Sequence, residues 1–343
     1  MMVEYLTMLL NRREVSVSIL LGIMSLLAMW IFSPVFTSNQ HNSYSANEIN
    51  TISTCISREV AINDETVDIS LVIPAYNEEK RIPAMLNSTL QYLHKWCKKI
   101  SIKFEIIVVD DGSSDETIKI SLETWKIFCQ SNNKNNIYSI NNFRIIKLDK
   151  NHGKGGAIKA GVLRSKGKYI LMVDADGATE ISDLEKLYHK IKDIEINDDK
   201  YGNVGIAVGS RAHLEEKSKA SRAFYRTILM HGFHILVSIL CTKTIKDTQC
   251  GFKLFTRNTA RILFRELHLE RWAFDVELFF VAEKYKIPMV EISVTWQEIE
   301  GSKLIQSKFD IIKTAVVMAR DMLCVKLAYD LGLWKMHTNN SEQ

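Results

Sequence analysis

The sequence lacks the cysteine patterns of a metal site or a disulfide-stabilised fold. Its six cysteines are scattered over 343 residues, and no two of them form a Cys-x-x-Cys pair. This spacing argues against a zinc site, and a chain of this length does not need disulfides in order to fold. We therefore expect free thiols, which favour a reducing compartment for the main domain.

Signatures of two further protein classes are also missing. The formal net charge is only +4, and no basic cluster is interleaved with aromatic residues, so nucleic-acid binding is set aside. No Gly-x-Gly-x-x-Gly follows the first predicted strand, which argues against a nucleotide-binding oxidoreductase. Hydrophobic residues make up 46% of the chain and charged residues 24%. That balance is typical of a folded core, in one large domain or two small ones.

The N-terminal region contains a long uncharged stretch. Residues 15–36 include no charged side chain. About 20 apolar residues match the thickness of a bilayer and exceed the apolar region of a cleaved signal peptide. We predict a short flank over residues 1–14, a transmembrane anchor over 15–36 and a polar linker over 37–66. Arg12 and Arg13 precede the anchor. If basic residues near the anchor alone set the orientation, the main domain would lie outside the cytosol.

Apolar strands alternate with helices after the linker. The strands are predicted over residues 69–73, 104–109, 143–148 and 169–173, and the helices over 81–98, 116–130 and 155–165. Near-continuous apolar strands are buried on both faces, so this α/β pattern predicts a Rossmann-like, mostly parallel sheet with helices on both sides. We expect this domain to span residues 67–303.

Two later apolar stretches are candidates for contact with the membrane. Residues 227–241 are strongly apolar, and we expect them at the membrane interface. Residues 304–343 are predicted to form amphipathic helices. For these, the membrane interface and the protein core are equally compatible with the pattern.

Polar motifs follow three of the predicted strands. They are Pro74-Ala-Tyr-Asn-Glu78, Asp110-Asp-Gly-Ser113 and Asp174-Ala-Asp176. Ligands of parallel sheets bind at the carboxyl ends of the strands. The three motifs are therefore predicted to form one site.

Asp174 and Asp176 have the spacing of a metal site. Gly177 allows a turn that presents both carboxylates to one cation. Hard oxygen ligands suit Mg²⁺ or Mn²⁺, which would bridge a diphosphate and stabilise it as a leaving group. For the pair alone, an Asx turn with a helix cap is the better interpretation. The two companion motifs favour the metal site.

The other strand-end residues are suited to a nucleotide. Asp111 offers acceptors for hydrogen bonds from uracil or ribose, while Ser114 or Asp115 is expected to cap the next helix. Tyr76 is a candidate to flank a base, and Glu78 to bind base or ribose; a loop followed by a helix start is the alternative.

A glycine-rich segment precedes the third predicted helix. The string Asn151-His-Gly-Lys-Gly-Gly156 lacks the spacing of a phosphate-binding loop. Two interpretations stay open. Lys154 reaches a phosphate, or the glycines only make a tight strand-to-helix connection.

Together these strings resemble family 2 glycosyltransferases with the GT-A fold. The strings are VIPAYNEE (72–79), VVDDGSSD (108–115), NHGKGGA (151–157) and VDADGAT (173–179). Later strings are similar to those of the eukaryotic dolichyl-phosphate β-glucosyltransferases in that family. They are GSR (209–211), DTQCGFK (247–253), ERWAFDVE (270–277) and EGSK (300–303). The QxxRW motif of processive members is absent.

The resemblance implies a reaction and a place in the cell. It implies UDP-glucose as donor, dolichyl phosphate as acceptor, a divalent metal, and inversion to dolichyl β-D-glucosyl phosphate for N-glycan assembly. It also implies the endoplasmic reticulum membrane, with the catalytic domain facing the cytosol, against the basic-residue count. A GDP-mannose-dependent transferase and a non-enzymatic membrane scaffold are the alternatives. Intact Asp111, Asp174 and Asp176 argue against the scaffold.

Roles carry over to matching positions of this sequence. The resemblance places Pro74, Tyr76, Glu78 and Asp111 in the nucleotide pocket, Asp174 against the donor, Asp176 as principal metal ligand and Arg211 facing phosphates. Related mannosyltransferases can use a third metal ligand two residues after the second Asp. Here that position is Ala178.

An anionic phosphate acceptor needs no general base, but it needs positive charge. The candidate cations are Arg211, Arg222, Arg226 and Lys303, with Arg226 preferred after Arg211. Asp275 and Glu277 are expected to orient the donor sugar or to hold those arginines, and a salt bridge without a catalytic role is the alternative.

Overall fold

The computed structural model describes residues 22–41, 49–52, 67–132, 142–213, 237, 240, 242–299 and 308–336. Within these ranges, none of the helices is both long enough and apolar enough to cross a membrane. Residues 15–21 of the predicted anchor lie outside them. The rest of that segment is helical over residues 22–31 and enters α2 (Ser33–His41).

The described part of the chain contains an eight-stranded sheet, with strand order β1-β4-β3-β2-β5-β9-β8-β10. The bounds are β1 Ile49–Ile52, β2 Val67–Ala75, β3 Phe104–Asp110, β4 Phe143–Leu148, β5 Gly167–Met172, β8 Ile206–Ser210, β9 Lys253–Thr256 and β10 Met289–Ser293. β1 and β9 pair antiparallel with their neighbours, and the other neighbouring strands pair in parallel. The mostly parallel sheet is therefore confirmed.

The four predicted strands are β2, β3, β4 and β5. Alternate side chains enter opposite cores, as a strand requires. In β3, Ile106 and Val108 join one buried cluster, whereas Ile107 and Val109 join the other. Every residue of β3 is buried. This explains why these strands are almost continuously apolar.

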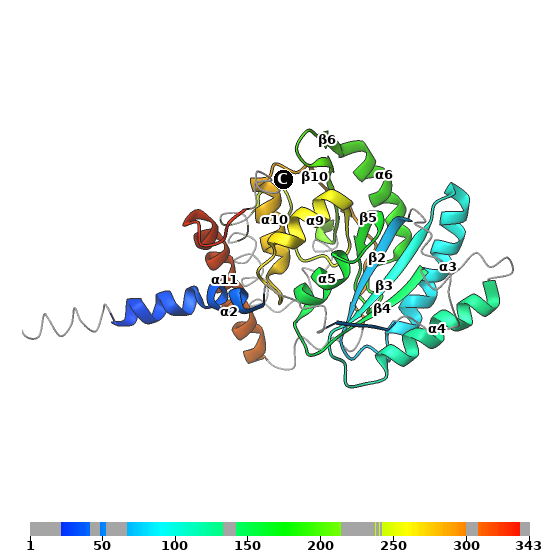
Figure 1. Ribbon diagram of the computed structural model, residues 1–343, viewed down its shortest axis with the longest axis horizontal. Helices are drawn as coiled ribbons and strands as arrows, with labels where there is room; N and C mark the ends of the chain where they lie inside the picture. The colour runs from blue at the N-terminus through cyan, green and yellow to red at the C-terminus, as the bar shows by residue number, and fades with distance from the viewer. Residues whose placement is uncertain are drawn as a thin grey trace, which may run out of the picture.

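Helices cover both faces of the sheet (Figure 1). One face carries α3 (Ile82–Ile100), α4 (Thr117–Asn132) and α6 (Leu184–Ile194). The other carries α5 (Lys154–Val162), α9 (Arg257–Glu266) and α10 (Phe274–Lys284). A short helical turn, η2 (Ile181–Asp183), precedes α6, and β6 (Ile196–Asp198) and β7 (Gly202–Val204) form a small separate hairpin. The predicted layer arrangement is confirmed.

The C-terminal helix α11 (Lys308–Asp330) packs against α10 and α2. Its side chains at Met322, Val325 and Ala328 are buried. For this part of the segment, the structure therefore shows a core placement. Within the predicted linker, α2 continues to His41, and β1 pairs antiparallel with β4.

Candidate active site

The carboxyl ends of three neighbouring strands, β3, β2 and β5, open into one cleft of about 370 Å³. The start of α5 and the loop before α10 complete its wall. All the residues predicted for the nucleotide and the metal lie along it: Pro74, Tyr76, Glu78, Asp111, Lys154, Asp174 and Asp176. The structure thus brings the three strand-end motifs together. Arg81, Arg271 and Trp272 also line the cleft and were not predicted to do so.

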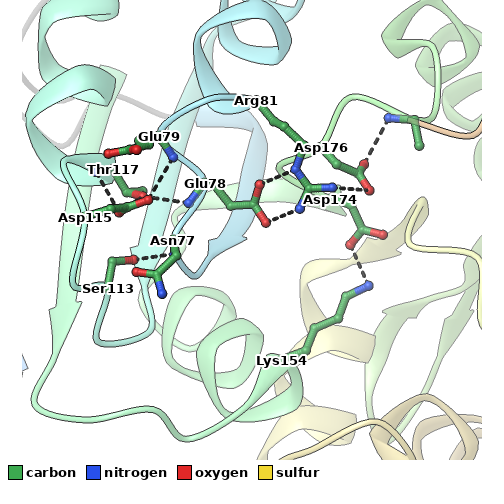
Figure 2. Close-up of polar contacts among 11 residues, drawn as sticks. Asn77, Glu78, Glu79, Arg81, Ser113, Asp115, Thr117, Lys154, Asp174 and Asp176 are labelled. Carbon is green, nitrogen blue, oxygen red and sulfur yellow. Dashed lines mark hydrogen bonds and ion pairs between the residues drawn. The ribbon is translucent and has the colours of Figure 1, made fainter. Parts of the chain in front are cut away.

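Asp174 and Asp176 lie on the turn that follows β5. Gly177 has a φ of 74°, a left-handed conformation that suits glycine. The Asp176 Oδ1 atom accepts a hydrogen bond of 3.0 Å from the amide of Ala178 (Figure 2). The Asx turn weighed as an alternative is therefore present, and it leaves Asp176 Oδ2 facing the cleft residue Arg81, with 3.8 Å between Oδ2 and NH1.

Asp174 is surrounded by positive charge. The Lys154 Nζ atom lies 2.6 Å from Asp174 Oδ1. Burial by itself would raise the pKa of Asp174, but the charge of Lys154, supported by Lys253 and Arg211, holds this pKa below its usual value. Burial opposes the charged form of Lys154 too, yet Asp174 and Asp275 raise its pKa. Both groups are consequently ionised at neutral pH.

The backbone at Gly251 closes against Asp174. A Cβ atom at this position would lie 2.0 Å from Asp174 Oδ2, so a side chain here would force the Asp174 carboxylate to move. The Lys253 Nζ atom donates to the Cys250 carbonyl at 2.6 Å and to Asp275 Oδ1 at 2.7 Å, and both charged side chains are buried. Sequence reasoning missed this support. A lysine next to the apolar Phe252 and Leu254 was the available signal.

Arg81 is a second residue that the sequence analysis missed. Its Nε and NH2 atoms donate to the two oxygens of Glu78, at 2.7 and 2.5 Å. Glu78, expected to bind base or ribose, is thus also the partner of an arginine. Their spacing of three residues, just before α3 begins at Ile82, was the available signal.

Asp111 binds backbone amides. Its Oδ1 and Oδ2 atoms accept from the amides of His152 and Gly153, at 2.7 and 2.9 Å. Burial raises the pKa of Asp111 to about 6, although these two hydrogen bonds favour the ionised form. The carboxylate therefore fixes the glycine-rich segment at the edge of the cleft, in addition to any contact with a ligand.

The glycines of that segment serve close packing. Added Cβ atoms at Gly153 and Gly155 would each lie 2.9 Å from the Glu270 carbonyl oxygen. Gly156 donates to the same oxygen at 2.9 Å. The tight connection is thus present, and Lys154 extends from it to Asp174. On the neighbouring motif, Asp115 caps α4 through a 3.0 Å hydrogen bond from the amide of Thr117, as predicted.

Comparison with known proteins identifies the family. Residues 70–264 match glycosyl transferase family 2. The chain belongs to this family. It is 48% identical over 272 residues to the dolichyl-phosphate beta-glucosyltransferase of Homo sapiens, covering 79% of this chain and 78% of that one. It is 42% identical over 276 residues to the protein of the same name from Saccharomyces cerevisiae, covering 80% and 78%. The predicted glycosyltransferase family is confirmed.

A distant likeness exists among solved structures. Glucosyl-3-phosphoglycerate synthase from Mycobacterium tuberculosis in complex with UDP is 14% identical, with a TM-score of 0.48 over 76% of this chain and 79% of that one. A likeness at this level says nothing about the ligands of the present glycosyltransferase.

The cations expected to hold an acceptor phosphate are only partly described. Arg211 donates to both oxygens of Asp247, through Nε and NH2 at 2.8 Å each, and its guanidinium lies over the ring of Trp296. Arg211 is not among the residues that line the cleft, although its charge acts on Asp174. Arg222, Arg226 and Lys303 lie outside the described residues, as does most of segment 227–241.

In the described part of this glycosyltransferase, the side chains of Asp275 and Glu277 bind groups other than arginine. Asp275 pairs with Lys253. Glu277 accepts from the amides of His268 and Leu269 and from the Tyr329 hydroxyl. Asp275 is therefore linked to the cleft through charge, because it raises the pKa of Lys154, whereas Glu277 ties α10 to α11.

The carboxylates of the cleft fit a divalent cation that a substrate helps to bind. No group of three or more His, Cys, Asp or Glu side chains able to hold a metal occurs among the described residues. Ala178 is 7% exposed, and its carbonyl oxygen accepts from the Gln297 amide at 2.9 Å. Mg²⁺ typically binds one or two carboxylates together with phosphates and water. Asp174 and Asp176 match that arrangement.

Proposed function

We propose that this glycosyltransferase transfers glucose from UDP-glucose to dolichyl phosphate, with inversion, giving dolichyl β-D-glucosyl phosphate for N-glycan assembly. The observation that carries the proposal is the single cleft in which Asp174 and Asp176 meet Tyr76, Glu78 and Asp111. The names of relatives that are 48% and 42% identical support this donor and acceptor.

The nucleotide and the metal are assigned to opposite parts of the cleft. In this proposal, Pro74, Tyr76, Glu78 and Asp111 bind the uridine, and Lys154 and Asp174 contact the diphosphate and sugar. A bound Mg²⁺ or Mn²⁺, with Asp176 as principal ligand and Asp174 beside it, supplies charge stabilisation to the leaving diphosphate. Lys154 adds a fixed positive charge 2.6 Å from Asp174.

The acceptor needs orientation rather than deprotonation. A dolichyl phosphate oxygen is already anionic, so it attacks the anomeric carbon of glucose directly as the bond from that carbon to UDP breaks on the opposite face. We assign the acceptor phosphate to Arg211 and Arg226, because cationic side chains bind phosphate through strong hydrogen bonds. Asp275 contributes by holding Lys253, which fixes the Cys250–Gly251 turn beside Asp174.

We also propose an endoplasmic reticulum membrane protein with one anchor over residues 15–36 and its catalytic domain in the cytosol. Residues 227–241 are assigned to the side that meets the lipid. Asn87-Ser-Thr89 is a glycosylation acceptor only in the lumen, and Asn87 is exposed on α3. An unmodified Asn87 in protein from eukaryotic cells is expected. A glycan on Asn87 would overturn the orientation.

A transfer assay tests the activity. Purified full-length protein is mixed with dolichyl phosphate, Mg²⁺ or Mn²⁺, and a panel of nucleotide sugars. Turnover with UDP-glucose is expected. Turnover with GDP-mannose alone would instead show a dolichyl-phosphate mannosyltransferase, and no turnover with any donor would show a non-enzymatic scaffold.

Two variants make the assay specific. Asp176→Asn is expected to abolish transfer and leave the fold intact, because it removes the principal metal ligand. Asp193→Asn, on the exposed surface of α6, is the matched control and is expected to keep full activity. Near-normal transfer by Asp176→Asn would show that Asp176 is not the principal ligand.

A further inference from the structure

Arg81 occupies the boundary between the nucleotide side and the metal side of the cleft. It directly precedes α3, and its side chain is 17% exposed while that of its partner Glu78 is 12% exposed. Figure 2 shows its guanidinium between the carboxylate of Glu78 and that of Asp176. No sequence motif singled this residue out.

Glu78 orients the guanidinium. The carboxylate accepts hydrogen bonds from Nε and NH2 of Arg81, at 2.7 and 2.5 Å. This bidentate pair defines the plane of the guanidinium. The remaining nitrogen, NH1, then points toward the metal side and lies 3.8 Å from Asp176 Oδ2, beyond hydrogen-bond length. Because two bonds hold the guanidinium plane, NH1 keeps this direction.

The two acidic residues of the metal site therefore each face a cation. Lys154 lies 2.6 Å from Asp174, and Arg81 lies 3.8 Å from Asp176. A divalent cation that binds these carboxylates alone meets the repulsion of both positive charges. A diphosphate that arrives with the cation brings negative charge and acceptors for NH1, which reverses the sign of the interaction.

We infer that Arg81 is a further donor-binding residue: its NH1 donates to the diphosphate, and its charge makes binding of the divalent cation depend on that diphosphate. The inference rests on the proposed use of a nucleoside diphosphate sugar with a divalent cation. It assigns Glu78 a positioning role through Arg81, beside any contact that Glu78 makes with the nucleotide.

A purely structural role for Arg81 predicts something different. If Arg81 only secured the loop before α3, its loss would lower the affinity for every ligand together and lower the melting temperature. A coupling role predicts opposite changes for two ligands. Removal of the charge strengthens the binding of the cation alone and weakens the binding of UDP in the presence of the cation.

The experiment measures binding rather than turnover, with the full-length protein. The affinity for Mn²⁺ alone is measured by electron paramagnetic resonance, and the affinity for UDP with saturating Mn²⁺ by calorimetry. For Arg81→Met we expect Mn²⁺ alone to bind roughly tenfold tighter and UDP with Mn²⁺ to bind roughly tenfold more weakly. Arg81→Lys keeps the charge and loses the two-point contact, so it should bind Mn²⁺ alone as the wild type does and UDP more weakly.

Controls separate the possible failures. Arg265→Met removes one positive charge from the exposed surface of α9 and should change neither affinity. Wild-type protein that binds UDP with Mn²⁺, together with an Arg81→Met variant that binds Mn²⁺ alone no more tightly, would overturn the coupling and leave the proposed function standing. Wild-type protein that binds no UDP even with Mn²⁺ would overturn both.

Discussion

Asp174 remains ionised in the cleft because cations surround it, and it stays in place because a glycine lies against it. Lys154 makes the direct ion pair at 2.6 Å, and the backbone of Gly251 occupies the space beside the other oxygen. The carboxylate therefore has little freedom to move. Fixed geometry of this kind is what a reaction centre requires, since small displacements cost large factors in rate.

Gly251→Ala tests this restraint. The added Cβ would lie 2.0 Å from Asp174 Oδ2, so the carboxylate must move. We expect kcat for sugar transfer to fall by about 100-fold, with a smaller change in the melting temperature. At Gly205, where a Cβ would lie 3.3 Å from Glu195, the same substitution should leave kcat unchanged. Equal activity of the two variants would contradict the restraint.

Asp111 gives a pH-dependent prediction. Burial raises its pKa to about 6 from an ordinary value of 3.8, so the folded protein retains this proton where the unfolded chain has released it. The contribution of Asp111 to the free energy of unfolding is therefore present below about pH 4 and is lost as the pH rises to about 6, a change of about 3 kcal/mol. Above that range it is constant.

The measurement compares wild type with Asp111→Asn, which does not titrate. Denaturant unfolding at several pH values between 4 and 7 should show the stability of the wild type falling relative to the variant through this window. A difference that does not vary with pH would show that the carboxyl has the same pKa in both states.

At the scale of elements, a buried ion pair joins β9 to α10. Lys253 belongs to the strand, Asp275 to the first turn of the helix, and their charged atoms are 2.7 Å apart. The lysine also binds the Cys250 carbonyl and so holds the turn that carries Gly251. One contact thus connects the packing of two elements with the position of Asp174.

Single and double substitutions separate the effect of this ion pair on stability from its effect on the position of Asp174. Lys253→Met or Asp275→Leu alone leaves a buried charge without its partner and should destabilise the protein by about 3–5 kcal/mol. The double variant removes both charges, and its melting temperature should return close to that of the wild type. Transfer activity should stay low, because the turn beside Asp174 has lost its hydrogen bond. Recovery of activity together with stability would mean that the pair serves stability alone.

At the scale of the whole molecule, the described parts pack as a sheet between two helical layers, with α11 added at one side (Figure 1). The Tyr329 hydroxyl of α11 donates to Glu277 at 3.1 Å, and the ring of Trp334 stacks on His268 with 4.2 Å between centroids. The same helix buries Met322 and Val325. The C-terminal segment is therefore part of the folded unit.

Truncation tests this conclusion. A chain that ends before Lys308 loses the buried side chains of α11, at a cost of about 5 kcal/mol or more, which is comparable with the whole stability of many domains. We expect this chain to be insoluble or to melt far below the wild type. Removal of residues 337–343 alone should be tolerated. A soluble, cooperative domain without α11 would contradict the expectation.

The sequence by itself determined the four central strands, the layered α/β class and the clustering of its polar motifs. Each depends on local pattern. An apolar run such as Phe104–Asp110 is buried on both faces, and the loops after parallel strands lie at one edge of the sheet. The family resemblance rested on the same short strings and is confirmed by the relatives.

Only the tertiary structure decided which partners those residues have. It placed β9 antiparallel beside β5, which brought Gly251 and Lys253 to Asp174. It turned the NH1 atom of Arg81 toward Asp176. These contacts join residues whose separation along the chain follows no period, so no pattern predicts them. The fold also shows that each of the two aspartates that first marked the site faces a positively charged side chain. Asp174 faces Lys154, and Asp176 faces Arg81.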